Sequence, residues 1–88
     1  MLSIKYVSEE WCGPCKSFWP IVQEICANNP NVSLVKVGVE HPEVKDLQIS
    51  SIPTVLFYKN GQLMHKSTGI MPKSQFNSLV DYYIVNKK

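Results

Sequence analysis

Cys12 and Cys15 are separated by two residues, a spacing typical of thiol–disulfide exchange when it follows a strand. The thiolate form of a cysteine attacks disulfides, so the reaction needs a site that stabilises a negative sulfur. We expect a helix to begin at Cys12, where unpaired N–H groups and the helix dipole favour negative charge. Cys15 follows about one helical turn later, on the same side of that helix. The pattern predicts that an exposed Cys12 attacks a substrate disulfide and that a shielded Cys15 resolves the mixed disulfide.

The same spacing also occurs in zinc sites, for which His41 and His65 would be the further ligands. However, the usual second pair of cysteines or histidines at ligand spacing is missing. The spacer Gly13-Pro14 joins a residue that permits a tight turn to one that restricts the backbone, which favours redox chemistry. We therefore expect no metal and no cofactor apart from the redox-active disulfide, and we expect both histidines at the surface.

The third cysteine, Cys26, lies eleven positions after Cys15 on the same predicted helix, about 16 Å along its axis. A disulfide between them within an intact helix is excluded by that distance. We interpret Cys26 as a small buried apolar residue, with a regulatory thiol or a dimer disulfide as alternatives. Four aromatic side chains are expected to be core or half-buried residues, namely Trp19, Tyr58, Tyr82 and Tyr83.

The 88-residue chain is long enough for a single domain, which we expect to span residues 1–88. Nine lysines and no arginine give a net charge of +2, which does not predict binding to nucleic acid. No apolar run approaches the length that spans a bilayer, and the N-terminus lacks the apolar region of a signal peptide. We expect a cytoplasmic monomer with neither a membrane nor a nucleic-acid partner.

Short runs with β-branched, aromatic or other apolar residues predict strands at residues 3–8, 32–39 and 54–59, and the chain is expected to return as a fourth strand at residues 62–68. Apolar side chains at helical spacing predict helices over residues 12–29 and after Pro72. A short helix is expected over residues 42–48, with Pro42 in its first turn. Asn60-Gly61 predicts a hairpin turn between the last two strands. The mostly apolar strand 32–39 is expected to be buried on both faces. Lys87 and Lys88 would suit the negative end of the last helix.

These elements follow the order βαβ(α)ββα. A strand, a helix and a strand in succession predict a parallel pair, whereas the hairpin predicts an antiparallel one. The expected fold class is therefore α/β, with a four-stranded mixed sheet flanked by about three helices.

The run Trp11-Cys12-Gly13-Pro14-Cys15-Lys16 resembles the active-site motif of thioredoxins. Further similarities follow in the family's order at Pro20, Ile52-Pro53-Thr54, Lys59-Asn60-Gly61 and Gly69. The resemblance covers most of the chain, from about residue 3 to about residue 86, and implies a thioredoxin-like fold. It also implies a protein disulfide reductase that serves electron transport and cell redox homeostasis, with protein disulfides as substrates and a thioredoxin reductase as electron donor.

The resemblance assigns further residues to the site. Trp11, Gly13, Pro14 and Pro53 would support the two cysteines, with Pro53 in the cis form against the sulfurs. The backbone at Ile52 would pair with the substrate chain. The apolar groove around Cys12 would consist of Trp11, Ile52, Pro53, Thr68 and Gly69.

The chain departs from the thioredoxin pattern in two respects. It starts at the strand before the active site, so the first strand and helix of a full-length thioredoxin are absent. Tyr6 stands where thioredoxins carry a buried Asp that takes the proton of the resolving thiol. A buried phenol is no effective base near neutral pH. We expect Lys36, at the place of the Lys that partners that acid, to donate to the Tyr6 oxygen.

Two other functions fit part of the pattern. The chain has the size of a glutaredoxin, which would use glutathione, but the active-site sequence differs and only Gly69 stands where glutaredoxins usually carry a pair of glycines. A thioredoxin-like binding subunit of a larger assembly is the other alternative, although both cysteines are present. Turnover with a thioredoxin reductase and with glutathione would separate these functions.

Overall fold

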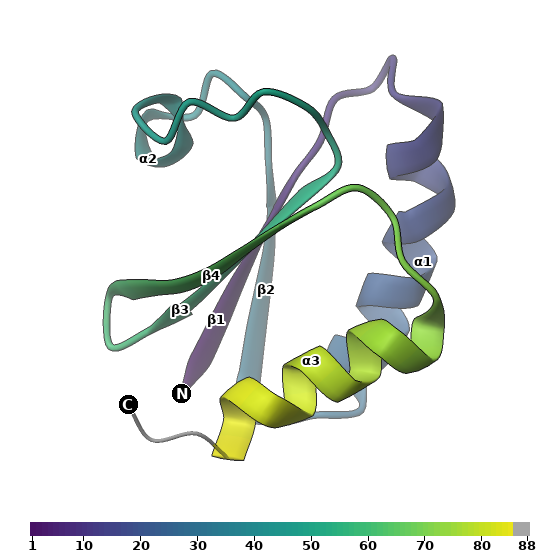
Figure 1. Cartoon of the computed structure of the whole chain (residues 1–88), viewed down its shortest axis with the longest axis vertical. Coiled ribbons are helices and arrows are strands. Elements are labelled where there is room, and N and C mark those ends of the chain that lie inside the picture. Colours follow the sequence, from purple (N-terminus) through teal and green to yellow (C-terminus); the bar gives the residue numbers. More distant parts are fainter. Residues whose placement is uncertain (86–88) are drawn as a thin grey trace.

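The structure is a computed structural model that describes residues 1–85. Its strands and helices are β1 (Leu2–Val7), α1 (Gly13–Ala27), β2 (Val32–Val37), α2 (Pro42–Lys45), β3 (Thr54–Lys59), β4 (Gln62–Thr68) and α3 (Lys73–Val85), as Figure 1 shows. This is the predicted order of elements. Lys87 and Lys88, which we expected at the end of the last helix, lie outside the described residues.

The four strands form one mixed sheet in the order β2-β1-β3-β4. β1 runs parallel to β2 and antiparallel to β3, and β3 is antiparallel to β4. Thr54 at the start of β3 pairs with Val7 at the end of β1 and with Thr68 at the end of β4. The loops that follow β1, precede β3 and follow β4 therefore meet at the same end of the sheet.

The two faces of the sheet are covered unequally. On one face α1 and α3 lie together (Figure 1), and Phe18 meets Phe76 edge to face at 5.5 Å between ring centroids. The opposite face is covered near one end by the short α2, whose buried Val44 packs with Val7 and Leu56. The central strands β1 and β3 are consequently the most buried, and they hold the site at their ends.

The β2 strand differs from its prediction. It ends at Val37 rather than at residue 39, and it is not buried on both faces, because Val35 is 51% exposed. Its place at the edge of the sheet explains the difference, since β2 has only β1 as a neighbouring strand. An apolar run of residues cannot by itself tell an edge strand from a central one.

The predicted hairpin turn between β3 and β4 is confirmed. Asn60 and Gly61 both have positive φ angles, 54° and 79°, which is the backbone shape of the tight turns that favour Asn-Gly. Within residues 1–85, no helix has the length and apolar character needed to cross a membrane.

Candidate active site

The disulfide between Cys12 and Cys15 lies at the start of α1. Cys12 is the residue that caps this helix, with extended backbone, and Pro14 occupies the first turn, where its missing N–H is no loss. The backbone N–H of Cys15 points at the Cys12 sulfur, 3.2 Å away. Gly13 occupies a helical position with open space where a side chain would stand, so no tight turn there demands glycine. A thiolate on Cys12 would therefore receive a helix N–H group directly.

Both sulfur-bearing residues are buried, which corrects the prediction of an exposed Cys12. Cys12 is 5% exposed and Cys15 is 2% exposed. The loop before β3 covers Cys12, whose Sγ lies 3.9 Å from the carbonyl oxygen of Ile52. That loop comes from a part of the chain forty positions away, so local spacing around the cysteines did not predict the cover. The two cysteines differ little in exposure. They differ in position, because Cys12 caps α1 whereas Cys15 lies inside its first turn.

The loop beside Cys12 is held in place by hydrogen bonds. The Ile52–Pro53 peptide bond is cis, as expected. The backbone N–H of Gly69 donates to the Pro53 carbonyl at 2.8 Å, and the Thr54 hydroxyl donates to the Ser51 carbonyl at 2.7 Å. Gly69 has a φ of 90°, which side-chain-bearing residues rarely adopt. The structure thus brings Ile52 and Pro53 to Cys12 and ties Gly69 to them.

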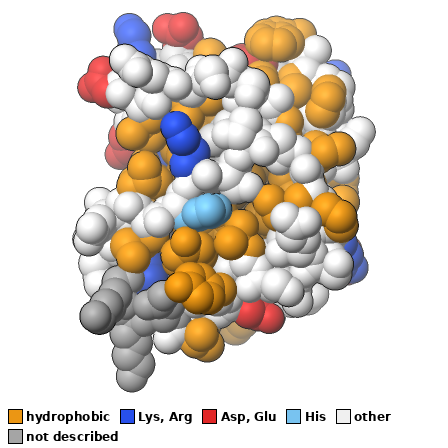
Figure 2. Space-filling model, viewed as in Figure 1, with side chains coloured by type: hydrophobic (Ala, Val, Ile, Leu, Met, Phe, Trp, Pro, Cys, Tyr) orange, Lys and Arg blue, Asp and Glu red, His pale blue; other side chains and the backbone are white. Residues whose placement is uncertain are grey.

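Exposed apolar side chains flank this arrangement. Trp11, directly before Cys12, is 78% exposed, and Ile70, directly after Gly69, is 60% exposed. Figure 2 shows apolar side chains at the upper end of the view, where Figure 1 places the loop before α1. Thr68 is exposed as well. Ile70 was missed by the sequence analysis, although an apolar residue next to a predicted groove residue is a signal that would have found it.

Tyr6 lies fully buried behind the active site. Its hydroxyl donates to the carbonyl oxygen of Cys15 at 2.6 Å, and burial raises the pKa of its phenol to about 12. The expected hydrogen bond from Lys36 is not formed, because the Lys36 ammonium lies 4.8 Å from the centre of the Trp19 ring instead. Lys36 pairs with Tyr6 in the sheet register, but the phenol reaches toward α1. The Tyr6 hydroxyl therefore donates its proton in a hydrogen bond to the backbone of α1, the helix that carries the disulfide.

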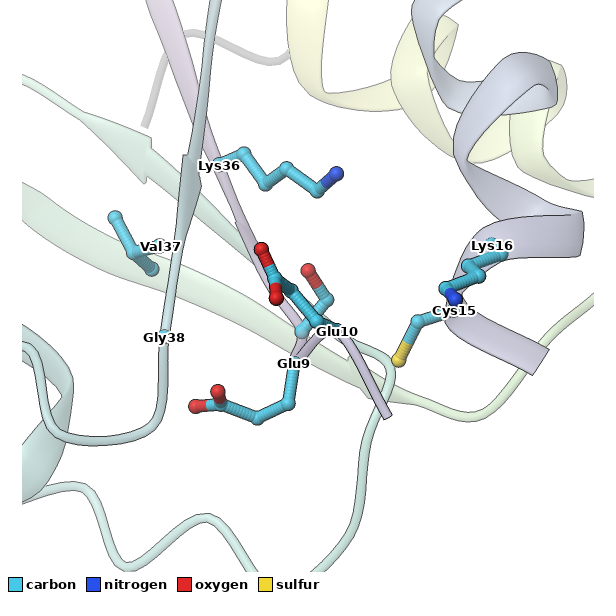
Figure 3. A pocket seen from close by; sticks show the side chains of 8 residues that line it. Glu9, Glu10, Cys15, Lys16, Lys36, Val37 and Gly38 are labelled. Carbon is cyan, nitrogen blue, oxygen red and sulfur yellow. The ribbon is translucent and has the colours of Figure 1, made fainter. Parts of the chain in front are cut away.

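A cleft of about 270 Å³ opens beside Cys15 (Figure 3). It is lined by Ser8, Glu9, Glu10, Cys15, Lys16, Lys36, Val37 and Gly38. Glu9 accepts a hydrogen bond from the backbone N–H of Val39 at 2.8 Å, which ties the loop before α1 to the end of β2. Glu9 and Glu10 were not predicted as site residues, although two adjacent acids directly before the Trp-Cys pair are a signal that could have found them. One side of the disulfide thus faces a charged, open space.

Cys26 is buried on α1 and makes no disulfide. Burial raises the pKa of its thiol to about 11, so it stays protonated near neutral pH. This confirms its interpretation as a small apolar core residue. Among the four aromatic residues expected to be core or half-buried, Tyr82 is 55% exposed and contradicts the expectation. It lies on the outer face of α3, with its ring edge to face with Tyr83.

The two histidines lie in separate places. His41 caps α2 by accepting a hydrogen bond from the backbone N–H of Glu43, and His65 stacks on Tyr83 at 5.5 Å between ring centroids. Within residues 1–85, no three His, Cys, Asp or Glu side chains lie close enough together to hold a metal ion. The residues considered for a zinc site are therefore not assembled into one.

A family model described as Thioredoxin matches residues 3–82. The thioredoxin of Mycoplasmoides gallisepticum is 36% identical over 72 residues, which cover 80% of this chain and 72% of that relative. The solution structure of the oxidised thioredoxin from Plasmodium falciparum superposes with a TM-score of 0.79 and 34% identity, covering 93% of this chain and 80% of the other. A mutant thioredoxin from Halobacterium salinarum shares the fold with a TM-score of 0.83 at 18% identity, covering 99% of this chain and 78% of the other.

Proposed function

This chain belongs to the thioredoxin family and is a thiol–disulfide oxidoreductase with a redox-active CxxC disulfide; from this premise we propose that Cys12 is its attacking thiolate and Cys15 its resolving thiol. The observation that carries the proposal is the position of Cys12 as the cap of α1, with the Cys15 N–H aimed at its sulfur. Cys15 lies inside the first turn and lines the cleft. Only Cys12 therefore combines a stabilising helix start with a place beside the Ile52 loop.

The reaction proceeds in two exchanges. The Cys12 thiolate attacks one sulfur of a protein disulfide, the substrate S–S bond breaks, and its other sulfur leaves as a thiolate that takes up a proton. Cys15 then loses its proton and attacks the Cys12 sulfur. The Cys12–Cys15 bond forms as the mixed disulfide breaks, and the second substrate sulfur leaves with the electron pair. Two electrons pass from the dithiol of this protein to the substrate.

We place the substrate chain in the groove formed by Trp11, Ile52, Pro53, Thr68 and Gly69. Three features support this placement. Trp11 is largely exposed, and the Ile52 carbonyl lies beside the Cys12 sulfur. The hydrogen bond from Gly69 to Pro53 joins the loop after β4 to the loop before β3. An extended substrate segment would pair with the Ile52 backbone. Pro14, in the first turn, and the helical Gly13 would hold the two cysteines in register.

The partners follow from the same chemistry. Protein disulfides are the substrates, and the oxidised dithiol requires a reductant, for which we propose a thioredoxin reductase. We further propose that residues 1–88 act as a single-domain monomer and that the protein works in the cytoplasm, where a dithiol is kept reduced. No observation on this chain favours glutathione as the reductant or a binding role without catalysis.

The experiment is to trap the mixed disulfide. Cys15→Ser, incubated with a protein disulfide, is expected to accumulate a covalent adduct that peptide mapping places at Cys12. Cys26→Ala in the same background is the matched control and should leave the adduct unchanged. An adduct at Cys26, or no adduct in a folded protein, would overturn the assignment. Turnover with a thioredoxin reductase, set against turnover with glutathione, then tests the donor.

A further inference from the structure

The resolving step needs an acceptor for the proton of Cys15. Tyr6 is the nearest buried side chain with an ionisable oxygen, but its hydroxyl already donates to the Cys15 carbonyl at 2.6 Å. It is also fully shielded from solvent. A phenol in this state holds its own proton and cannot take another. The acceptor must therefore reach Cys15 from another direction.

The cleft beside Cys15 offers that direction. Figure 3 shows the Cys15 sulfur on the α1 side of the cleft and the Glu10 carboxylate turned toward Lys36 and Val37 on its β2 side, whereas the Glu9 carboxylate turns toward Gly38. The position of Glu9 agrees with the hydrogen bond that it accepts from the backbone N–H of Val39. A Cβ atom on Gly38 would lie 2.9 Å from Oε2 of Glu9, so the two residues are close neighbours. A space of about 270 Å³ is roomy enough for several water molecules. Solvent can thus connect the sulfur with the Glu10 carboxylate.

The other charged groups of the cleft do not serve as acceptors. Lys16 and Lys36 carry N–H donors and have no accepting lone pair when protonated. The Glu9 carboxylate accepts from the backbone N–H of Val39 and turns toward Gly38, away from Cys15. Within residues 1–85, Glu10 makes no hydrogen bond or ion pair, so its carboxylate is available.

We propose that Glu10 is the proton acceptor for the resolving thiol of this protein, working through solvent in the cleft in place of a buried acid. The proposal rests on the assignment of Cys15 as the resolving cysteine. In the step, the proton of the Cys15 thiol passes through water to the Glu10 carboxylate. The Cys15 thiolate then attacks the Cys12 sulfur, the mixed disulfide breaks, and the substrate thiolate leaves with the electron pair. Glu10 returns its proton to solvent before the next cycle.

Two roles of Glu10 predict opposite results, which makes the proposal testable. A fixed negative charge near Cys15 disfavours its thiolate, so removing that charge would speed the resolving step. A proton acceptor speeds the step, so removing it would slow the reaction. The other titratable groups around Cys15 are Tyr6 from β1, which bonds its carbonyl, and three that line the same cleft, namely Glu9 from the same loop, Lys16 from α1 and Lys36 from β2. They stay in place in a Glu10 variant.

The experiment follows the mixed disulfide by rapid acid quenching after the reduced protein meets a protein disulfide, from pH 5 to pH 9. Glu10→Gln is expected to slow decay of the mixed disulfide about tenfold at pH 7, with the difference fading at high pH, where hydroxide replaces the carboxylate. Its formation, measured in the Cys15→Ser background, should stay within about twofold. Glu10→Asp, which keeps a carboxylate, should recover part of the rate.

Glu9→Gln is the matched control, because it removes a charge from the same cleft while its amide oxygen still accepts from Val39. It should change decay by less than about twofold. Unchanged or faster decay in Glu10→Gln, or equal slowing in Glu9→Gln, would overturn the proposal. Slower formation of the mixed disulfide in Glu10→Gln would also overturn it. If Cys15→Ser traps nothing at Cys12, the assignment of the two cysteines fails instead, and the two failures are thereby distinguished.

Discussion

The Cys12 side and the Cys15 side of the disulfide are surrounded by different kinds of chemical group. On the Cys12 side the sulfur meets backbone groups, namely the N–H of Cys15 at 3.2 Å and the carbonyl oxygen of Ile52 at 3.9 Å. On the Cys15 side the surroundings are side chains: a buried phenol behind the carbonyl and a cleft with carboxylates and ammonium groups. Both cysteines are buried, but Cys12 lies against the Ile52 loop, whereas Cys15 borders the cleft that Figure 3 shows.

The attack by Cys12 and the resolving step by Cys15 have different chemical requirements, and each side of the disulfide suits one of them. Stabilising a thiolate on Cys12 needs the free N–H groups of a helix start, which the backbone supplies whatever the neighbouring side chains are. Removing a proton from Cys15 needs a base, which only a side chain or solvent can supply. The backbone side therefore matches the thioredoxin pattern, and the side-chain side is where Tyr6 departs from it. Substitutions on the two sides should have effects of different kind and size.

The largest effect is expected on the backbone side. Cys12→Ser should lower turnover of a protein disulfide at least about a thousandfold, or about 4 kcal/mol of barrier, because no other thiol caps the helix beside the Ile52 loop. The measurement is reductase turnover at pH 7, with thermal unfolding as the control for folding. A folded Cys12→Ser protein that keeps more than a tenth of the turnover would show that the two sides do not differ in this way.

Placing a carboxyl at position 6 tests the side-chain side through stability. Burial would raise the pKa of the new Asp above its unfolded value of about 3.9. Because the folded pKa is raised, this penalty is absent below about pH 4 and grows with pH until the folded group also ionises. At pH 7 the cost should be a few kcal/mol, about 3, including lost aromatic packing with Trp19.

Urea unfolding of Tyr6→Asp and of wild type at pH 4 and pH 8 measures that difference. The part due to lost packing is present at both values, so the change between them reports the carboxyl alone. An equal penalty at both pH values would mean that position 6 is solvated in the variant and that the region behind Cys15 is open on this side too.

Tyr6→Phe removes the hydroxyl and keeps the ring. We expect turnover within about threefold of wild type, because no proton transfer is lost. Stability should fall by about 1 kcal/mol at pH 7 through loss of the hydrogen bond to Cys15. The folded pKa of Tyr6, about 12, lies above its unfolded value near 10, so this contribution is present below pH 10 and is lost as pH rises toward 12.

The measurement for Tyr6→Phe is unfolding at pH 7 and above pH 10, together with turnover at pH 7. The stability gap to wild type should shrink in alkali, since only wild type has a phenol to ionise. A hundredfold loss of turnover would show that the phenol takes part in proton transfer, which would contradict the role given to the cleft.

The smallest effect is expected at Cys26, which touches neither side of the disulfide. Cys26→Ala should leave turnover within about threefold, or about 0.7 kcal/mol of barrier. The folded pKa of about 11 lies above the ordinary value of 9.0, so wild type loses stability as pH rises from 9 to 11. Unfolding at pH 8 and pH 10.5 should show less of this loss in the variant. A tenfold drop in turnover of the folded variant would contradict its role as a core residue.

Several features of the fold and the site were predictable because they depend on neighbours in sequence. The boundaries of β3 and β4 follow from the turn at Asn60-Gly61, which demands positive φ, and from the apolar run before it. The start of α1 follows from the spacing of its apolar residues and from Pro14. The cis bond at Ile52–Pro53 came from the resemblance to thioredoxins alone, since a proline that opens a strand is unremarkable.

The sequence by itself determined which residues carry the chemistry and that they stand at a helix start, because three-residue spacing and helix capping act within one turn of backbone. Only the tertiary structure decided what surrounds them. Packing between distant segments places the Ile52 loop over Cys12. It also places the Lys36 ammonium over the Trp19 ring and not at the Tyr6 oxygen. Those contacts depend on strand order, register and shape, in which many residues compete for the same space. The opening of a cleft toward Glu10 is the result of that competition.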